Sequence, residues 1–491
     1  MKSKTMLKNQ IKSAADSIYQ LIRGTEAPKY LSMISCLCIV LALGNIMFSF
    51  GMGQLFTHTY QEKFQIFIYP LLLLLSGKVV YAVAEFLKGR LEVKLQANLN
   101  FHYRMIIAEK YAKAKYEWQE TQKTGDLVDR VQEDTDSAAM AVATYLPKAV
   151  KSLVIFGVTI FVLFSVDWRL SVAYLFPVPF LFIFNAWGSK VSQRYFDDSR
   201  VANSARNAKI QDVINNRTTI KAYSLEDTVE REIENKILCY VKKISNALAM
   251  MPLSFSPAIL FNKIPSILLG VIGCALVIQN NLHSESFIMI FTLSITTADE
   301  IRELDDFMAN IPSLLAYAKR LFPIWDSPQQ VFGREIACQD TVHAFELENV
   351  SFAYSNVNFG ASKILTDFNL RIKKGERVVI VGKSGSGKST VLKLAGGLYE
   401  PSRGTIKIFG RKIEDWDERI FHQLVGYMSQ DIFLWPMSIE ENIQLAQSNR
   451  KIISLEQAVK FSGITGSLNK LSDGLKTQVG ERGTSLSGGQ R

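Results

Sequence analysis

The strongest chemical signal in the chain is a glycine-rich run that fits the pattern G-x-x-x-x-G-K-[ST]. It consists of Gly382, Lys383, Ser384, Gly385, Ser386, Gly387, Lys388, Ser389 and Thr390. Glycines in such a loop let successive backbone N–H groups point at phosphate oxygens, beside the positive end of the following helix. We therefore expect the run to bind nucleotide phosphates. Lys388 should reach the β- and γ-phosphates, and the Ser389 hydroxyl should bind Mg²⁺.

The residues around this run predict the elements that hold it. The β-branched stretch Val378–Val381 predicts a short buried strand directly before it, and 390–398 predicts a helix directly after it. Alternation of apolar and polar residues in 344–354 predicts an earlier strand of the same α/β unit. A phosphate-binding loop between a strand and a helix is the arrangement of P-loop nucleotide hydrolases.

The part of the chain before this unit is much more apolar and predicts an α-helical membrane domain. A helix needs about 20 apolar residues to cross a bilayer. Six stretches come close to that length: 31–56, 64–87, 145–166, 169–188, 255–279 and 286–302. The last is the weakest, because its uncharged run stops at Ala298.

The positions of Lys and Arg predict which loops face the cytoplasm. Residues 88–151 and 189–250 each contain eleven of them, whereas 57–63 contains one and 280–286 contains none. Positive charge collects on the cytoplasmic side, so both long loops and both termini should lie there, in a multi-pass protein of the cell membrane. This placement accounts for the net charge of +10 without a nucleic acid partner.

The two long polar loops predict helical extensions of the spans into the cytoplasm. Both contain strong helix formers and few glycines or prolines. In each loop, a helix of about 30 residues would lead away from the membrane and another of about 30 would return, so the loop would extend roughly 45 Å into the cytoplasm. Residues 1–30 predict an amphipathic helix on the membrane surface, with an ordinary soluble helix as the alternative.

Charged residues inside the predicted spans leave two interpretations open. Lys78 and Lys263 either reach toward the cytoplasmic interface or face a cavity or partner. Asp299, Glu300, Arg302 and Glu303 interrupt the sixth span, where the helix either enters a wet cavity or leaves the bilayer early. We favour an acidic cavity wall suited to a cationic or peptidic cargo. The five cysteines show no metal-binding spacing, and we expect free, mostly buried thiols.

The end of the sequence resembles one family of P-loop proteins. Leu486-Ser487-Gly488-Gly489-Gln490 matches the signature pentapeptide of ATP-binding-cassette (ABC) proteins. Tyr427–Asp431, which contains Gln430, resembles their Q-loop, and Thr477–Gly483 resembles the X-loop of exporters. Lys123–Leu127 and Ile220–Tyr223 resemble the family's cytoplasmic loops, which implies short coupling helices near 118–123 and 203–210. With the fused spans, the chain is similar to a type IV ABC exporter half. Its layout would be 1–30 elbow helix, 31–325 membrane domain, 326–343 linker and 344–491 nucleotide-binding domain.

The resemblance implies a dimer of two half-transporters in the lipid bilayer that exports an unknown substrate with ATP and Mg²⁺. ATP would be bound by Tyr354, which stacks on adenine, by 382–390 and by Gln430 of one subunit. Ser487, Gly488, Gly489 and Gln490 of the other subunit would complete the site. Lys388 and Gln430 would be catalytic, and Ser389 and Gln430 would bind the metal.

One departure from the family pattern is large. The family's Walker B aspartate, catalytic glutamate and switch histidine follow the signature, and the sequence ends at Arg491. On its own this chain is expected to bind ATP weakly, without hydrolysis, and to lack a neighbour for the strand before the phosphate-binding loop. The alternatives to an exporter are an ATP-gated channel or regulator on the same fold, and a non-functional truncated fragment.

Overall fold

The computed structural model describes residues 15–58, 65–122, 124–339, 341–354, 363–429, 432–445, 454–468, 471–480 and 486. The chain divides into two compact units. The first contains the residues up to Ala114 together with Trp118–Gln329, and the second contains Lys115–Glu117 together with the residues from Gln330 onward. A short piece of the first long loop thus belongs to the second unit.

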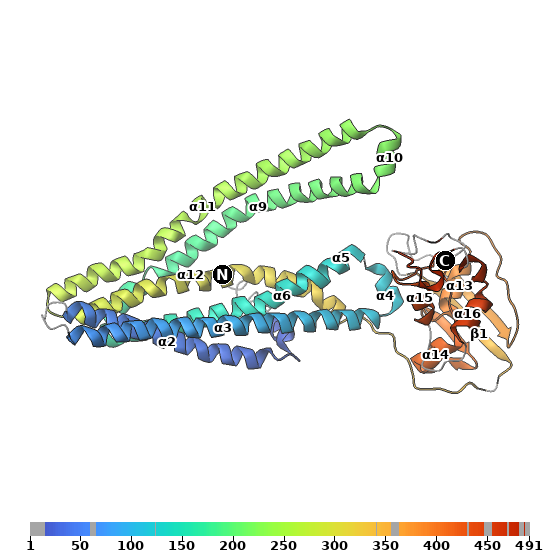
Figure 1. Ribbon diagram of the computed structural model, residues 1–491, viewed down its shortest axis with the longest axis horizontal. Helices are drawn as coiled ribbons and strands as arrows, with labels where there is room; N and C mark the ends of the chain where they lie inside the picture. The colour runs from blue at the N-terminus through green and yellow to red at the C-terminus, as the bar shows by residue number, and fades with distance from the viewer. Residues whose placement is uncertain are drawn as a thin grey trace. The chain divides into compact units, whose positions relative to one another are not determined.

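Long helices build the first unit and run side by side (Figure 1). They are α2 (Ala27–His58), α3 (Gln65–Ala112), α7 (Leu146–Val166), α8 (Trp168–Leu175), α9 (Val178–Asn215), α11 (Glu226–Ile278) and α12 (Ser284–Trp325). Shorter elements connect them: α4 (Tyr116–Thr121), α5 (Thr124–Asp129), α6 (Thr135–Met140), α10 (Arg217–Ala222) and the π-helical turns η1 (Arg130–Asp134) and η2 (Ala141–Tyr145).

Within the described residues, five helical segments are long and apolar enough to cross a membrane. They are Ala27–Phe56, Phe67–Ala112, Thr124–Val166, Trp168–Asn215 and Glu226–Ile278. Each overlaps one of the first five predicted spans. The sixth predicted span, 286–302, lies within the 42-residue helix α12. The acidic residues of α12 make it too polar to count among these five segments. A total of six membrane spans therefore stays a prediction.

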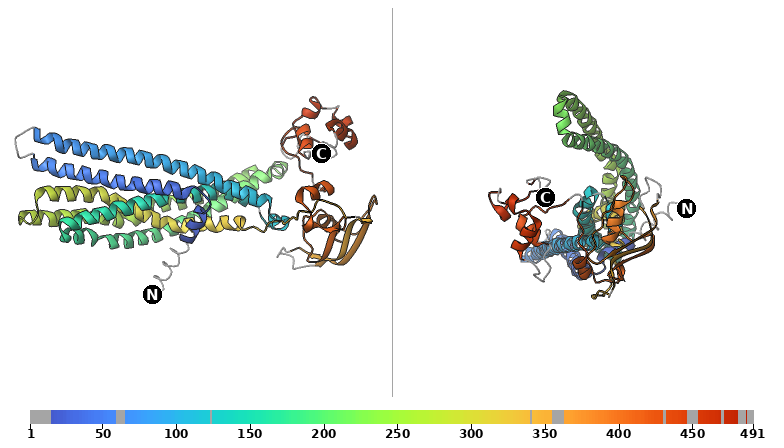
Figure 2. Two further views of the ribbon diagram at one scale, coloured as in Figure 1. Left: turned by 90° about the horizontal axis from the view of Figure 1, so that it is seen from below. Right: turned by 90° about the vertical axis from the view of Figure 1, so that its right-hand side faces the viewer.

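Glycines allow α2 and α3 to pack closely as an antiparallel pair, seen from a second direction in Figure 2. A Cβ atom added at Gly51 would lie 2.8 Å from the backbone nitrogen of Leu74. One added at Gly77 would lie 2.7 Å from the backbone nitrogen of Phe48. Such distances leave no room for a side chain, so small residues set the spacing of the pair, as is common in membrane helices.

The charged residues of the membrane unit have specific partners. Lys151 on α7 lies 3.2 Å from Glu300 and 3.0 Å from Glu303 on α12. Its side chain and that of Glu300 are almost fully buried. The prediction of an acidic wall is therefore wrong for Glu300 and Glu303, because a lysine from the neighbouring helix pairs with both. Lys78 lies over the Phe48 ring, 3.9 Å from its centroid, so an aromatic partner accompanies this charge.

The helical extensions of the two long loops form as predicted, and one of the two turns lies elsewhere. α4 overlaps the short helix expected near 118–123. Residues 203–210 lie inside α9, and the turn is instead made by α10 at 217–222. No glycine or proline occurs between Ser189 and Asn215, so nothing in this stretch breaks the helix and α9 ends later than expected.

The second unit contains an antiparallel sheet with strand order β2-β1-β3-β4. Its strands are β1 (His343–Ala353), β2 (Lys363–Lys373), β3 (Arg403–Ile408) and β4 (Arg411–Lys412). Its helices are α13 (Lys388–Ala395), α14 (Glu418–Leu424), α15 (Ile439–Gln444), α16 (Leu455–Ser462) and α17 (Thr465–Leu468), with the 3-10 turns η4 (Ile413–Asp415) and η5 (Gly474–Lys476).

Leu347 and Phe352 of β1 pack with Leu394 of α13 in the core. The strand predicted at 344–354 is therefore confirmed by β1.

Residues 378–381 do not form the buried strand predicted before the phosphate-binding loop. They have no regular secondary structure, and the side chains of Val379 and Val381 are 83% and 84% exposed. A strand needs backbone hydrogen bonds to a neighbour, and in the part of the chain that the structure describes no strand pairs with this segment.

The cysteines are all free thiols, as predicted. The expectation that most are buried is wrong: Cys38 is buried, whereas Cys36, Cys239, Cys274 and Cys338 are exposed. Cys36, Cys239 and Cys274 lie on the outer faces of long helices, where a thiol contacts lipid or solvent and not a protein core.

Candidate nucleotide-binding site

The glycine-rich run forms a tight loop that leads into α13. Gly385 and Gly387 adopt positive φ angles of 82° and 88°, which residues with a Cβ rarely tolerate. Gly387 is the N-cap of α13, and a Cβ there would lie 2.9 Å from Cγ2 of Ile364. Both the backbone angle and the close contact therefore require glycine at 387.

Lys388 closes the loop on itself. Its ammonium group donates hydrogen bonds to the carbonyl oxygens of Gly382, at 3.0 Å, and Lys383, at 2.8 Å. These carbonyls lie at the start of the loop and Lys388 at its end, so the side chain spans the opening. Its charge is thus held where phosphate oxygens would replace the two carbonyls as acceptors.

The start of α13 can accept negative charge and a metal ion. No side chain caps the N-terminus of α13, so its first N–H groups and the helix dipole face outward from Gly387. Ser389 is exposed at the first turn. Mg²⁺ usually keeps several waters and is bound through substrate phosphates and few protein oxygens. One serine hydroxyl beside a phosphate-binding loop fits that requirement.

The described residues contain no group of three or more His, Cys, Asp or Glu side chains that could hold a metal ion on their own.

Tyr354 lies next to this loop, directly after β1. Its hydroxyl is 3.2 Å from the Thr390 hydroxyl on α13, which links the end of the sheet to the loop. Its ring packs edge to face against Phe352, at 5.0 Å, and Tyr399, at 5.3 Å. The structure therefore brings Tyr354 together with the phosphate-binding residues.

A lysine and two further tyrosines extend this group, and the sequence analysis missed all three. The Lys393 ammonium lies over the rings of Tyr354, Tyr399 and Tyr116, at 5.7, 5.3 and 5.8 Å. Tyr116 comes from the 115–117 segment, and its ring meets that of Tyr399 edge to face. Lys115 also pairs with Glu400 at 2.7 Å. No spacing pattern joins residues so far apart in the chain, so only the folded structure reveals the group.

The remaining predicted site residues lie outside the described residues. These are Gln430 of the Q-loop and Ser487, Gly488, Gly489 and Gln490 of the signature. Their immediate neighbours are described. The Tyr427 ring packs on the end of α13, where a Cβ at Gly396 would be 3.0 Å from it.

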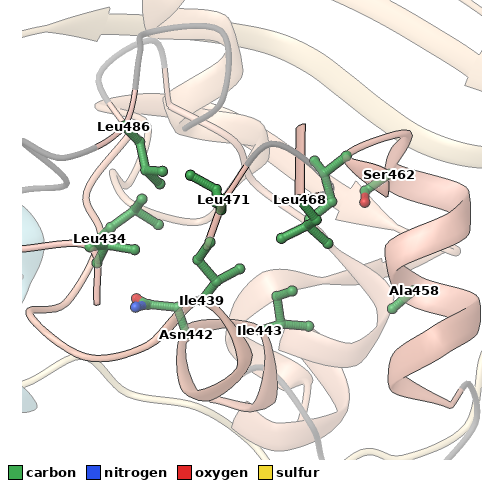
Figure 3. A pocket seen from close by; sticks show the side chains of 11 residues that line it. Leu434, Ile439, Asn442, Ile443, Ala458, Ser462, Leu468, Leu471 and Leu486 are labelled. Carbon is green, nitrogen blue, oxygen red and sulfur yellow. The ribbon is translucent and has the colours of Figure 1, made fainter. Parts of the chain in front are cut away.

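Leu486, the first residue of the signature, lines an apolar cavity of about 360 Å³ (Figure 3). Leu434, Ile439 and Leu471 point into the same space.

Local hydrogen bonds shape the start of α15 and pair the residues around it with Thr477 and Val479 of the X-loop segment. The Ser438 hydroxyl accepts from the N–H of Glu441 at 3.2 Å, and the Glu441 carboxylate accepts from the N–H of Ser438 at 2.8 Å. This capping box starts α15. The N–H groups of Ile439 and Val479 donate to Thr477 and Met437. Ser438 lowers the pKa of the Glu441 carboxyl through its backbone N–H and its hydroxyl.

Comparison with known proteins agrees with this arrangement. Residues 31–298 match the family model described as the ABC transporter transmembrane region, and 365–491 match the model described as ABC transporter. The chain is 26% identical to ABC transporter B family member 1 of Dictyostelium discoideum over 381 residues, which are 75% of this chain and 40% of that protein.

Two bacterial relatives have names that refer to toxin translocation. The exotoxin translocation ATP-binding protein PaxB of Pasteurella aerogenes is 26% identical over 423 residues, or 85% of this chain and 57% of that protein. The alpha-hemolysin translocation ATP-binding protein HlyB of Escherichia coli shows the same identity and coverage. The chain thus spans about half the length of the curated relatives it matches.

Proposed function

The chain belongs to the ABC transporter family, and we propose that it is one half of an ATP-driven exporter that works as a dimer in the cell membrane. The observation that carries this proposal is the union in one chain of apolar membrane-length helices with a phosphate-binding loop closed by Lys388. A soluble ATPase would not need membrane-length helices, and a simple channel would not need a phosphate-binding loop.

We infer that the Lys388 ammonium changes its hydrogen-bond acceptors when ATP binds. The Lys388 ammonium would leave the carbonyl oxygens of Gly382 and Lys383 for the phosphate oxygens, which carry more negative charge. The free N–H groups of α13 would add to this attraction. Mg²⁺, held by Ser389 and the phosphates, would stabilise the charge that develops during phosphoryl transfer. Tyr354 is close enough to the loop to stack on adenine.

The second half of the site would come from a second subunit. Ser487–Gln490 are expected to cap the ATP bound at the partner's loop, so a two-fold pair would form two composite sites. In this scheme Gln430 would orient the attacking water.

The 115–117 segment would carry motion from the nucleotide unit to the spans. It packs within the second unit through Tyr116 and Lys115, and it follows α3 directly in the chain. A displacement of the second unit would therefore pull on the end of a helix that crosses the membrane.

A cavity of about 560 Å³ between α9, α11 and α12 is the candidate cargo surface. Lys263 and Arg302 line it together with Asp299 and Asp306, beside the apolar side chain of Phe255. Both signs of charge are thus present, whereas the sequence favoured an acidic wall. The toxin-translocating relatives make a peptide or protein the first cargo to test.

A complementation experiment tests the composite site. In full-length protein reconstituted in liposomes, subunits with Lys388→Ala or with Ser487→Arg should each be inactive as homodimers. Mixing the two should restore ATP hydrolysis, because one of the two sites in each mixed dimer is intact. Inactive mixtures, or an active homodimer of either variant, would show that the sites do not span two subunits.

Cysteine labelling tests the topology. In a cysteine-free background, Ser284→Cys at the start of α12 should react with an impermeant thiol reagent in intact cells. Ser204→Cys on α9 should react only after the membrane is opened. The reverse pattern would place the long helical arms outside the cell.

A further inference from the structure

A groove of about 600 Å³ runs along the outer face of the α2–α3 pair. Its apolar lining includes Met33 and Val40 from α2 and Leu87 from α3, all exposed. Toward the end opposite Val40 and Leu87, the groove is lined by two basic residues, Arg90 and Lys94. They are four residues apart on a helix and therefore lie on the same face, about 6 Å apart along its axis.

The groove crosses the level at which the hydrocarbon core meets the headgroups. The apolar part of α3 begins at Phe67, and about 20 residues span the hydrocarbon core. Leu87 therefore lies near its end, and Arg90 and Lys94 lie at the headgroup level. On α2, the matching position is next to Met33, since Tyr30 accepts a hydrogen bond from Asn98 farther along α3. This end of α3 leads into the loop rich in Lys and Arg, which we place on the cytoplasmic side.

The charges of the two basic residues are not neutralised in the described part of the chain. Lys88, between the groove residues in sequence, is buried and pairs with Glu85 at 2.9 Å and Glu92 at 3.4 Å. These two carboxylates are therefore already engaged. Among the described residues, Arg90 contacts the Phe86 ring at 5.9 Å and forms no ion pair, and neither does Lys94.

We propose that this groove binds one anionic phospholipid of the inner leaflet. Arg90 and Lys94 contact its phosphate at the level of Met33, and one acyl chain lies along Leu37, Val40 and Leu87. The lipid phosphate supplies the missing negative charge, and the acyl chain matches a lining that is apolar toward the bilayer centre. Basic pockets between membrane helices on the cytoplasmic side recognise such headgroups. The orientation of the groove rests on the topology proposed above.

Lipid retention tests the proposal without any ATPase measurement, so its failure is separate from failure of the transport function. Full-length protein is reconstituted with phosphatidylcholine and phosphatidylglycerol, extracted in mild detergent, and analysed for bound lipid by mass spectrometry. The unaltered protein should retain phosphatidylglycerol in preference to phosphatidylcholine. Arg90→Gln with Lys94→Gln should lower phosphatidylglycerol retention at least about tenfold and leave phosphatidylcholine unchanged.

Two controls separate the groove from general electrostatics. Lys236→Gln with Lys242→Gln removes the same charge from exposed positions on α11 and should retain the lipid. Val40→Trp fills the groove without changing charge and should lose it, whereas Val79→Trp on the exposed face of α3 should not.

Either of two results would overturn the site. One is equal retention by the Arg90/Lys94 double variant and the unaltered protein. The other is full retention by Val40→Trp. Loss of retention with the α11 double variant would instead show that total charge, and not the groove, holds the lipid. Competition by glycerol phosphate alone would assign the site to a free phosphate.

Discussion

The ring of Tyr116, from the first long loop, meets the ring of Tyr399 edge to face with 5.5 Å between their centroids. Aromatic pairs of this geometry contribute about 0.5–1.5 kcal/mol beyond their buried area. Lys393 lies over both rings, and the contact therefore ties residues 115–117 to the α13 end of the nucleotide unit.

Removing this ring should weaken transport more than nucleotide binding. Tyr116→Ala in the full-length protein should leave the affinity for a fluorescent ATP analogue within about twofold and reduce ATP-dependent transport several-fold, since the loop loses its anchor. Tyr116→Phe keeps the ring edge and is the matched control. Equal losses of binding and transport would show that Tyr116 acts on the nucleotide site itself.

Gly387 should tolerate no side chain. Alanine there faces a φ of 88° and a contact of 2.9 Å with Ile364, and the left-handed backbone alone costs about 1–2 kcal/mol. We expect Gly387→Ala to lower affinity for the ATP analogue at least about tenfold, measured by equilibrium titration. Gly426→Ala is the control, because a Cβ there has no atom within 4 Å. An unchanged affinity for Gly387→Ala would mean that the loop rearranges freely.

Lys151 should be essential for folding of the membrane unit. Removing it leaves Glu300 without its cation in a nearly fully buried position, and breaking a buried ion pair from one side costs about 3–5 kcal/mol.

Lys151→Met should therefore lower the thermal unfolding temperature in detergent and the expression level. Adding Glu300→Gln and Glu303→Gln should restore much of the loss. Lys190→Met, at an exposed position on α9, should have little effect. If Lys151→Met alone were as stable as the parent, water would already solvate the group of Lys151, Glu300 and Glu303.

The capping box at Ser438 and Glu441 predicts an acid-sensitive start of α15. The pKa of the Glu441 carboxyl is lowered in the folded protein from its ordinary value of 4.5, first by the Ser438 N–H and then by its hydroxyl. A lowered folded pKa means that the stabilisation is present above about 4.5 and is lost as the pH falls through the folded value.

Hydrogen exchange of the α15 amides, corrected for the intrinsic rate, measures this effect. Protection should fall below pH 4 in the parent protein. In Glu441→Gln, which no longer titrates, protection at pH 7 should be lower and should change less with pH. Glu440→Gln, which leaves the capping box intact, should behave like the parent. If protection changed with pH in the same way in Glu441→Gln and the parent, the Glu441 carboxylate would not cause the acid sensitivity of α15.

Local patterns made some features predictable. The phosphate-binding loop follows from residues adjacent in the chain, and the first five spans follow from continuous apolar runs, so both could be predicted from short windows. The strand at 344–354 has the alternation of a half-buried strand and formed as expected. Each of these signals lies within a single element and needs no knowledge of its neighbours.

The features that the sequence did not reveal depend on distant partners. Whether 378–381 forms a strand depends on a neighbour to pair with, and its own β-branched residues cannot provide one. The acidic residues of α12 looked like a cavity wall because Lys151, about 150 positions earlier in the chain, was not recognised as their partner. Likewise, the turn at α10 depends on where α9 stops, and a stretch without glycine or proline does not show that point.

The close backbone contacts at Gly51 and Gly77 restrict how the membrane unit can move. Sliding α2 along α3 by one turn would bring larger side chains to places where only a hydrogen atom fits. Neither helix can therefore change register against the other without first separating. In any movement of the membrane unit, α2 and α3 would therefore move together as one rigid hairpin.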